Sequence, residues 1–227
     1  MKSHLNTNKT IIITGSSRGI GLELVKILSE NHRIIALSRN IESIKNLPNV
    51  EAYSVDFLDP TFAEKLDFKA FGKVDGVIHN AGKLINKPFE KLTHSDFLEV
   101  YQVNVFAVVQ LTQALLPHLQ KGSHVVNISS MGGIQGSSKF PGLAAYSSSK
   151  GALITLTEML AEEYKESGIS FNALALGAVQ TEMLAEAFPG YQAPTTAREM
   201  ARFIADFTLN GHQFFNGKVL PVAHSTP

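Results

Sequence analysis

Two residues suited to proton transfer, Tyr146 and Lys150, lie four positions apart in the segment Tyr-Ser-Ser-Ser-Lys. Leu153, Leu156 and Leu160 follow at helical spacing, which predicts one helix with the phenol and the ammonium on the same face. A phenol has an ordinary pKa of about 10, and a neighbouring ammonium lowers that pKa by favouring the ionised form. Such a pair suits proton exchange with a carbonyl oxygen. The same spacing also occurs in exposed helix pairs, so its meaning depends on the surrounding elements.

Two further polar residues occupy informative places. Ser130 follows the apolar run Val125–Ile128, and a hydroxyl at that strand end could donate to a substrate oxygen while charge develops on it. Serines at strand ends also form turns. Asn104 shares one helical stripe with Val100 and Val108, so we expect it to be buried. A buried Asn needs either hydrogen-bond partners or a function.

A glycine-rich segment, Thr14–Gly21, follows the first apolar run and opens a helical pattern. Gly15, Gly19 and Gly21 would let backbone amides approach a pyrophosphate at the helix N-terminus. Their spacing is G-x-x-x-G-x-G rather than the commoner G-x-G-x-x-G, and it also suits a tight strand-to-helix turn. The position after the first strand favours dinucleotide binding.

The end of the second predicted strand bears on which dinucleotide binds. An NAD site normally has an acid about 20 residues beyond the glycines, where it accepts a hydrogen bond from the ribose. The stretch Asn31–Ile41 contains no acid, and the strand ends at Ser38 and Arg39. A guanidinium there could hold the 2′-phosphate of NADP, and Arg18 could reach the same phosphate. Either arginine alone could be an ordinary surface residue, but together with the missing acid they predict NADP.

The elements that position these residues follow from the apolar pattern. Strands are predicted at Thr10–Thr14, Arg33–Ser38, Val50–Val55, Val74–His79, His124–Ser129, Ile169–Leu176 and Lys218–Val222. Their near-continuous apolar character is typical of a parallel sheet covered on both faces, and helical patterns separate them. We therefore expect an α/β protein with a three-layer doubly wound Rossmann fold and a mainly parallel seven-stranded sheet. Its site would lie at the carboxyl ends of the strands.

Helix starts are predicted from capping signals. These signals stand at Asp59-Pro60, at Thr93 with Asp96, and at Thr196 with Glu199. The second begins a long helix that Pro117 ends.

Composition limits the class of protein. The 227 residues are 44% hydrophobic with a formal net charge of zero, which predicts a single domain over residues 1–227 and no nucleic-acid partner. Cysteine is absent and the histidines lack metal-ligand spacing, so we expect no disulfide and no metal. No apolar run reaches the roughly 20 residues that cross a bilayer, and the chain does not open on a signal-peptide pattern. We expect no membrane partner and a cytoplasmic location.

Taken in chain order, these features resemble the "classical" form of the short-chain dehydrogenase/reductase family over Thr10 to about Val222. The segment Thr14–Gly21 is similar to the family's cofactor signature. His79-Asn80-Ala81-Gly82 resembles its Asn-Asn-Ala-Gly element, with His in place of the first Asn. The residues that match its catalytic tetrad one by one are Asn104, Ser130, Tyr146 and Lys150.

The resemblance implies a role for each tetrad residue. Tyr146 would exchange the proton, and Lys150 would hold the nicotinamide ribose and lower the tyrosine pKa. Ser130 would polarise the carbonyl, and Asn104 would keep a water in the proton relay. Asp56 would contact adenine. The full set of implied cofactor-binding residues is Gly15, Ser17, Arg18, Gly19, Ile20, Gly21, Ser38, Arg39, Asp56, Asn80, Ala81, Gly82, Tyr146, Lys150, Gly177, Val179 and Thr181.

Three features depart from the family pattern. Leu176-Gly177 stands where the family usually has Pro-Gly, and the loop Met131–Ala145 is longer than usual. The segment Glu182–Pro194 is short where many relatives carry a larger substrate lid. We expect this substrate-loop segment to leave the pocket comparatively open, with the longer loop folding over from the opposite side. Phe188–Tyr191 could equally line a substrate or turn the chain.

The leading functional hypothesis is an NADP(H)-dependent oxidoreductase that interconverts a carbonyl and an alcohol on a small or medium organic substrate. A 3-oxoacyl carrier-protein reductase or a steroid-type dehydrogenase would keep the same tetrad. A dinucleotide-binding regulator without activity is the alternative from another class, and the complete tetrad argues against it. A nucleotide-sugar epimerase or dehydratase would need more chain after Thr181. The resemblance also implies a homodimer or a homotetramer.

Overall fold

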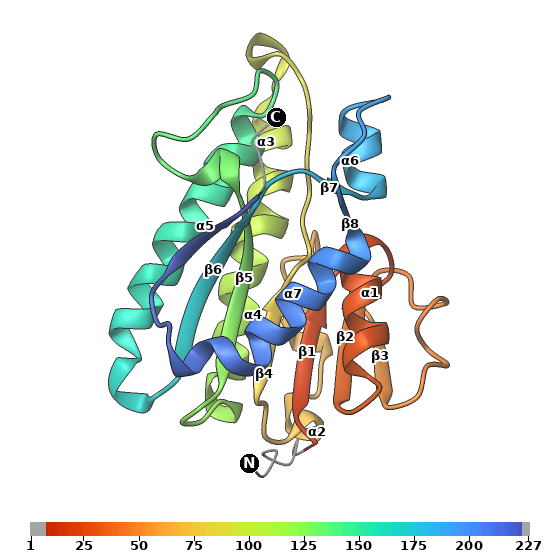
Figure 1. The fold of residues 1–227 in the computed structure, drawn as a ribbon, viewed down its shortest axis with the longest axis vertical. Coiled ribbons are helices and arrows are strands. Elements are labelled where there is room, and N and C mark those ends of the chain that lie inside the picture. The colour runs from red at the N-terminus through yellow and green to blue at the C-terminus, as the bar shows by residue number, and fades with distance from the viewer. Residues whose placement is uncertain (1–7, 224–227) are drawn as a thin grey trace.

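The computed structural model describes residues 8–223, and these residues form a parallel sheet in the strand order β3-β2-β1-β4-β5-β6-β9. Its strands are β1 (Thr10–Thr14), β2 (Arg33–Ser38), β3 (Val50–Ser54), β4 (Gly76–His79), β5 (His124–Ser130), β6 (Ser170–Leu176) and β9 (Val219–Val222). Two short strands, β7 (Val179–Gln180) and β8 (Thr195–Thr196), pair separately above the sheet (Figure 1). The predicted doubly wound, seven-stranded parallel sheet is confirmed.

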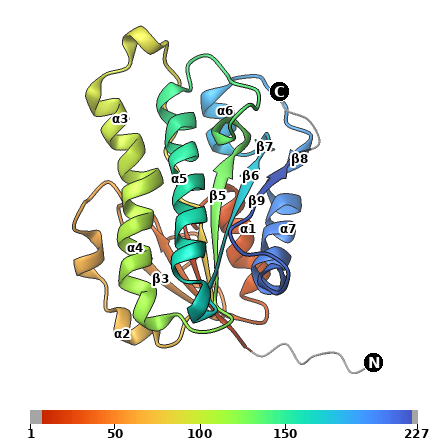
Figure 2. The ribbon, with the colours of Figure 1, turned by 90° about the vertical axis from the view of Figure 1, so that its left-hand side faces the viewer.

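Helices cover both faces of the sheet (Figure 2). One face carries α1 (Gly19–Leu28) and α7 (Ala197–Asn210), and the other carries α3 (His94–Tyr101), α4 (Ala107–Leu115) and α5 (Ala144–Glu163). Shorter helices are α2 (Phe68–Phe71) and α6 (Glu182–Ala187). Within residues 8–223, no helix has the length and apolar character needed to cross a membrane.

Strand β1 shows why the predicted strands are apolar throughout. Ile11 and Ile13 belong to the core between the sheet and the α1/α7 layer, whereas Ile12 belongs to the core on the opposite face. All three side chains are fully buried. A strand covered on both faces buries every side chain, so the pattern lacks the alternation of a half-exposed strand.

Predicted strand ends agree with the observed ends within two residues. Val55, Val74 and Ile169 were included in predicted strands and lie just outside them, although all three are buried. Ser130 was left out of the fifth strand and ends β5. The apolar pattern therefore reports burial, which extends slightly beyond the ladder of paired backbone groups.

The helix predicted to begin at Asp59-Pro60 is wrong. A short 3₁₀ turn at Phe62–Lys65 stands there instead. The Asp59 carboxylate accepts hydrogen bonds from the backbone and the hydroxyl of Thr61, at 2.9 and 2.7 Å. Such local side-chain contacts compete with helix formation and favour a turn.

The two capping boxes, at Thr93 with Asp96 and at Thr196 with Glu199, are confirmed. The long helix that starts at Thr93 is not uniform, because a π-helical turn at Gln102–Phe106 separates α3 from α4. Asn104 lies in this turn. Such turns insert one residue into a helix and are frequent at functional sites.

Candidate active site

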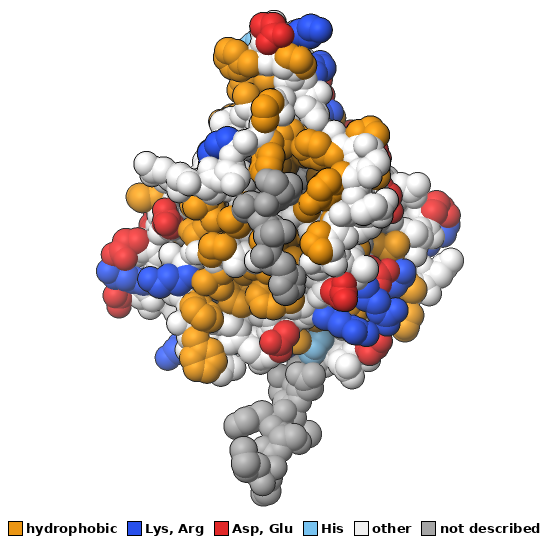
Figure 3. All heavy atoms as spheres, turned by 45° about the horizontal axis from the view of Figure 1, so that its top comes forward, with side chains coloured by type: hydrophobic (Ala, Val, Ile, Leu, Met, Phe, Trp, Pro, Cys, Tyr) orange, Lys and Arg blue, Asp and Glu red, His pale blue; other side chains and the backbone are white. Residues whose placement is uncertain are grey.

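A cleft of about 670 Å³ lies along the edge where the sheet strands end. At one end it is lined by Arg39 and Asp56, which follow β2 and β3, and at the other by Phe188 and Tyr191, which follow α6. Figure 3 looks obliquely toward this edge, with hydrophobic side chains grouped in the middle of the face and charged ones toward its margins. The cleft is where the doubly wound sheet was expected to place the site.

The glycines after β1 leave room that no other residue would leave. Gly15 has φ of 67°, and a Cβ added there would lie 2.8 Å from the Cα of Ala81. A Cβ added at Gly21 would lie 2.0 Å from the carbonyl oxygen of Gly15. These close approaches create a backbone cradle at the N-terminus of α1, a place that suits an anion.

Hydrogen bonds lock this cradle to the end of β4. The Thr14 hydroxyl accepts from the backbone N–H groups of Asn80 and Ala81, both at 3.0 Å. The Asn80 carboxamide donates to the carbonyl oxygens of Thr14 and Gly15, both at 3.1 Å. This role of Thr14 was not predicted from the sequence. A hydroxyl at the last position of an otherwise aliphatic strand was the available signal.

The two arginines predicted to bind a 2′-phosphate differ in their surroundings. Arg39 lines the cleft and has no ion pair with a carboxylate in the described part of the chain. Beside it, the Ser38 hydroxyl donates to the Ser17 hydroxyl at 2.8 Å. Arg18, in contrast, pairs with Glu186 of α6 at 2.5 Å. Only Arg39 therefore presents an unpaired guanidinium to this end of the cleft.

Tyr146 lines the cleft in the first turn of α5, and its side chain is hydrogen-bonded with Ser130 at the end of β5. Burial raises the pKa of Tyr146 to about 12, and the Ser130 hydrogen bond opposes that rise. The sequence predicted a tyrosine pKa lowered by Lys150. In the structure the pKa of Tyr146 is raised instead, because burial outweighs the opposing effect of the Ser130 hydrogen bond.

Lys150 is not part of an exposed helix pair, since its exposed fraction is 3%. Its ammonium donates to the Ile128 carbonyl oxygen at 2.7 Å and lies 5.7 Å from the centre of the Tyr146 ring. Burial lowers the pKa of Lys150 to about 8. The ammonium is thus held in the cleft, beside Tyr146.

Asn104 is fully buried behind the cleft, as predicted. Its Oδ1 accepts from the backbone N–H of Lys83 at 2.8 Å, and its Nδ2 donates to the Lys83 carbonyl at 3.0 Å. The same Nδ2 donates to the Ser149 hydroxyl at 2.9 Å, and that hydroxyl donates to the Tyr146 carbonyl at 2.6 Å. Asn104 therefore joins the segment after β4 to the turn of α5 that carries Tyr146.

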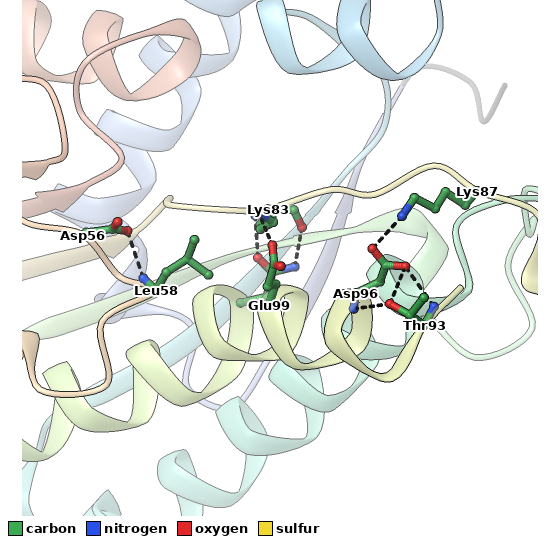
Figure 4. A network of polar contacts seen from close by, with 8 residues as sticks. Asp56, Leu58, Lys83, Lys87, Thr93, Asp96 and Glu99 are labelled. Carbon is green, nitrogen blue, oxygen red and sulfur yellow. Dashed lines mark hydrogen bonds and ion pairs between the residues drawn. The ribbon is translucent and has the colours of Figure 1, made fainter. Parts of the chain in front are cut away.

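Two lysines of the segment after β4 form ion pairs with acidic residues of α3 (Figure 4). Lys83 pairs with Glu99, and Lys87 pairs with Asp96, both at 2.7 Å. Asp96 also accepts from the backbone and the hydroxyl of Thr93, and the Lys87 contact is the first of the causes that lower the Asp96 pKa to about 2. Both lysines are thereby held away from free interaction with a substrate.

The short segment after β7 contacts both sides of the cleft. The Thr181 hydroxyl caps α6 by accepting from the Leu184 N–H at 3.2 Å. At the other end of α6, the Asn86 carboxamide donates to the Ala187 carbonyl at 2.9 Å. Asn86 was not predicted as a site residue, because no local pattern connects it with a residue 101 positions away. The predicted openness of this pocket stays a prediction.

The loop before α5, Met131–Ala145, contacts the segment after β4, and whether it covers the pocket from the opposite side stays a prediction. The backbone N–H of Lys87 donates to the Gly142 carbonyl at 3.1 Å. Gly142 has φ of 86°, and a Cβ added there would lie 2.0 Å from the Asn86 Oδ1. Phe140 and Leu143 of this loop line the cleft.

The structure brings nearly all of the predicted site residues to the cleft. Those that line it are Gly15, Ser17, Arg18, Gly19, Ile20, Ser38, Arg39, Asp56, Asn80, Ala81, Gly82, Ser130, Tyr146, Lys150, Gly177, Val179 and Thr181. Gly21 and Asn104 lie behind it. The Asp56 carboxylate, predicted to contact adenine, accepts a hydrogen bond from the Leu58 N–H at 3.0 Å. Leu176, which stands where the family usually has Pro, is the last residue of strand β6. Among residues 8–223, no group of three or more His, Asp or Glu is arranged to hold a metal ion.

Known proteins resemble this chain in sequence and in fold. Residues 9–192 match the family model described as short chain dehydrogenase. Oxidoreductase BOA17 of Botryotinia fuckeliana is 33% identical over 211 residues, which cover 88% of this chain and 75% of that protein.

Solved structures extend the likeness to nearly the whole chain. A short chain dehydrogenase from Burkholderia cenocepacia in complex with NADP is 26% identical, with a TM-score of 0.83 and coverage of 95% of this chain and 96% of that chain. A 4-hydroxyisoleucine dehydrogenase complexed with NADH is 23% identical, with a TM-score of 0.84 and coverage of 95% and 97%. Because proteins of this fold bind either dinucleotide, the choice must be argued from this chain's own residues.

Proposed function

The chain belongs to the short-chain dehydrogenase family of oxidoreductases, and from that membership we propose that it interconverts a carbonyl and an alcohol with NADP(H). The substrate would be a small or medium organic molecule. The observation that carries the proposal is the arrangement of Tyr146, Ser130 and Lys150 in one cleft. A partly buried phenol and a hydroxyl meet there, with an ammonium held beside them.

The glycine cradle fits the pyrophosphate of a dinucleotide. A Cβ at Gly15 or Gly21 would collide with backbone atoms, so the glycines leave the N-terminus of α1 open to an anion. Asp56 would contact the adenine, and Gly177, Val179 and Thr181 would surround the nicotinamide. When bound, the cofactor supplies the hydride that the reaction transfers.

The preference for NADP is supported by Arg39. Its guanidinium lines the cleft with no paired carboxylate in the described chain, and Ser38 is uncharged. A charge-assisted contact with a 2′-phosphate would contribute about 1.5–3 kcal/mol, which corresponds to roughly tenfold or more in affinity.

The proton path is proposed from the same geometry. Tyr146, whose pKa is raised to about 12, is protonated near neutral pH and can give its hydroxyl proton to a carbonyl oxygen. Ser130 can donate to that oxygen while negative charge develops on it. Lys150 would hold the nicotinamide ribose, and Asn104 would keep the relay water at the turn of α5. These roles match those implied by the family resemblance, except that Lys150 does not lower the Tyr146 pKa here.

The test is a screen of aldehydes, ketones and acyl thioesters for oxidation of NADPH, with NADH in parallel. We expect at least one carbonyl class to oxidise NADPH, and tighter binding of NADPH than of NADH. Equal dissociation constants for the two dinucleotides would refute the cofactor preference. Tight dinucleotide binding without turnover of any carbonyl would instead favour a regulator. The cytoplasmic location and the homo-oligomer stay predictions.

A further inference from the structure

The end of the cleft beside Tyr146 is bounded by three chain segments that contact one another. The segment after β4 is joined to the loop before α5 through the Lys87–Gly142 backbone hydrogen bond. It is joined to α6 through the bond from Asn86 to the Ala187 carbonyl. These contacts place the segments side by side, around the end of the cleft where Tyr146 and Ser130 meet.

The side chains that these segments contribute are predominantly apolar. They include Leu84 and Ile85 from the first segment, Phe140 and Leu143 from the loop, and Phe188 and Tyr191 after α6. Most are partly exposed, with Tyr191 at 37%, although large apolar side chains usually prefer full burial. A concave site lined in this way gains most from covering apolar surface.

The cations that line the cleft are not free to bind an anionic group at the substrate end. Among the described lining residues, Arg18 pairs with Glu186 and Lys83 pairs with Glu99. Arg39 is unpaired but follows β2, and strands β1 and β4 separate β2 from β5, whose end carries Ser130. Lys150 donates to a backbone carbonyl and is assigned to the cofactor.

The acids that line the cleft lie beside the glycine loop. Glu186 pairs with Arg18, and a Cβ added at Gly19 would lie 3.3 Å from the Glu182 Oε2. A carboxylate on the substrate would lose water without gaining a free cation. Burying an unpaired charge is strongly unfavourable, whereas an uncharged group of similar size incurs no such cost.

On these observations we propose that the substrate is an uncharged ketone or aldehyde with a bulky apolar substituent, rather than an oxo acid or a phosphorylated carbonyl compound. The inference rests on the proposed carbonyl reduction. In that reaction the carbonyl carbon gains the hydride and its oxygen gains the Tyr146 proton. The product is the alcohol, and NADPH is oxidised to NADP⁺. The apolar wall would hold the substituent, while Tyr146 and Ser130 face the oxygen.

A matched pair of ketones tests whether the protein prefers an uncharged substrate. Methyl 4-acetylbenzoate and 4-acetylbenzoate share the same reacting carbonyl and ring, and they differ in whether the far group is an ester or a carboxylate. We expect kcat/KM with NADPH to be at least about tenfold higher for the ester. Equal values, or a preference for the acid, would overturn the proposal.

A binding measurement separates this inference from the proposed function. The ester, the acid and a neutral alkyl ketone are each titrated calorimetrically into protein saturated with NADP⁺, which needs no turnover. Tighter binding of a neutral ketone supports the inference even if no carbonyl oxidises NADPH, an outcome that would count only against the proposed function. Equal binding of the acid, or binding of none of the three, would contradict the inference.

A cation placed in the apolar wall should weaken the preference for the uncharged substrate. Phe188, which follows α6, lines the cleft. Its side chain has no polar atom, so replacing it removes no hydrogen bond or ion pair. In Phe188→Arg we expect the ester-to-acid ratio of kcat/KM to fall by about tenfold. Phe188→Leu is the matched control and should keep the preference for the ester. An unchanged ratio in the arginine variant, with NADPH binding retained, would show that this wall does not contact the substrate.

Discussion

The two ends of the cleft are built by different means. At the cofactor end, side chains and glycines stand at the ends of neighbouring strands, and hydrogen bonds between side chain and backbone join Thr14 to Asn80. At the substrate end, the walls come from segments outside the main sheet. Side-chain contacts attach α6 to both ends of the cleft, through Asn86 at the substrate end and through the pair of Glu186 with Arg18 at the cofactor end.

Because of this difference, we expect the two ends to tolerate different substitutions. Atoms at the cofactor end are surrounded by backbone, which moves little, so an added methyl group has no space. The substrate end depends on exposed side chains, and contacts between exposed charges contribute little to stability. We therefore expect substitutions to have large effects near the strand ends and smaller, more selective effects near α6.

The largest expected effect is at Tyr146, which lies beside Ser130 at the substrate end. Tyr146→Phe removes the transferable proton but keeps the ring, so kcat should fall by about 10²–10⁴-fold while the NADPH dissociation constant changes little. Steady-state kinetics and calorimetric titration measure the two quantities. Tyr164→Phe, at the far end of α5, is the control and should leave kcat unchanged. Residual turnover above a tenth in Tyr146→Phe would exclude this residue as the main proton donor.

The next effect tests the backbone cradle. In Gly21→Ala the new Cβ would lie 2.0 Å from the Gly15 carbonyl oxygen, so the helix or the cradle must move. Overpacking of this kind typically lowers the free energy of unfolding by about 1–3 kcal/mol, and we expect NADPH binding to weaken at least tenfold. Thermal unfolding and calorimetric titration measure both. Gly151→Ala, whose nearest contact is 3.2 Å, should cost less, and equal losses in the two variants would contradict the rigid-cradle interpretation.

The 2′-phosphate contact should have an intermediate effect. Replacing Ser38 by Asp and Arg39 by Ala exchanges a cation for an acid at the end of β2, so the cofactor preference should reverse from NADPH to NADH. We expect NADPH to bind about tenfold or more weakly. Arg202→Ala, on α7 and away from the lining of the cleft, is the control. If the double variant still prefers NADPH, another group must hold the phosphate.

The smallest effect is expected where α6 meets the cofactor end. Glu186 occupies the Arg18 guanidinium and would compete with a cofactor phosphate for it. An exposed pair of this kind contributes about 0.2–1 kcal/mol, so Glu186→Gln should tighten NADPH binding by up to about fivefold. The gain should shrink at high ionic strength. Glu162 of α5 forms a similarly exposed ion pair with Lys165, so Glu162→Gln is the control and should leave NADPH binding unchanged. Weaker binding in Glu186→Gln would mean that the ion pair helps to build the site.

Much of the fold and of the cofactor end could be predicted from the sequence, because their signals are local. Tyr146 and Lys150 share one helical face through a spacing of four, and both capping boxes connect residues three positions apart. Continuous apolar runs predicted strands buried on both faces, and strand order then gathered the residues at the strand ends. The π-helical turn at Asn104 escaped prediction, since one inserted residue leaves the apolar stripe nearly unchanged.

The amino-acid sequence alone determined the element types, the glycine cradle and the set of reactive side chains. The tertiary structure decided their environments. It paired Arg18 with Glu186, which lies 168 positions away, and left Arg39 without such a partner among the described residues. It also raised the Tyr146 pKa, which spacing alone had suggested would fall. The physical reason is that local spacing sets which groups share a face. Desolvation and ion pairing depend instead on what distant segments bring beside them.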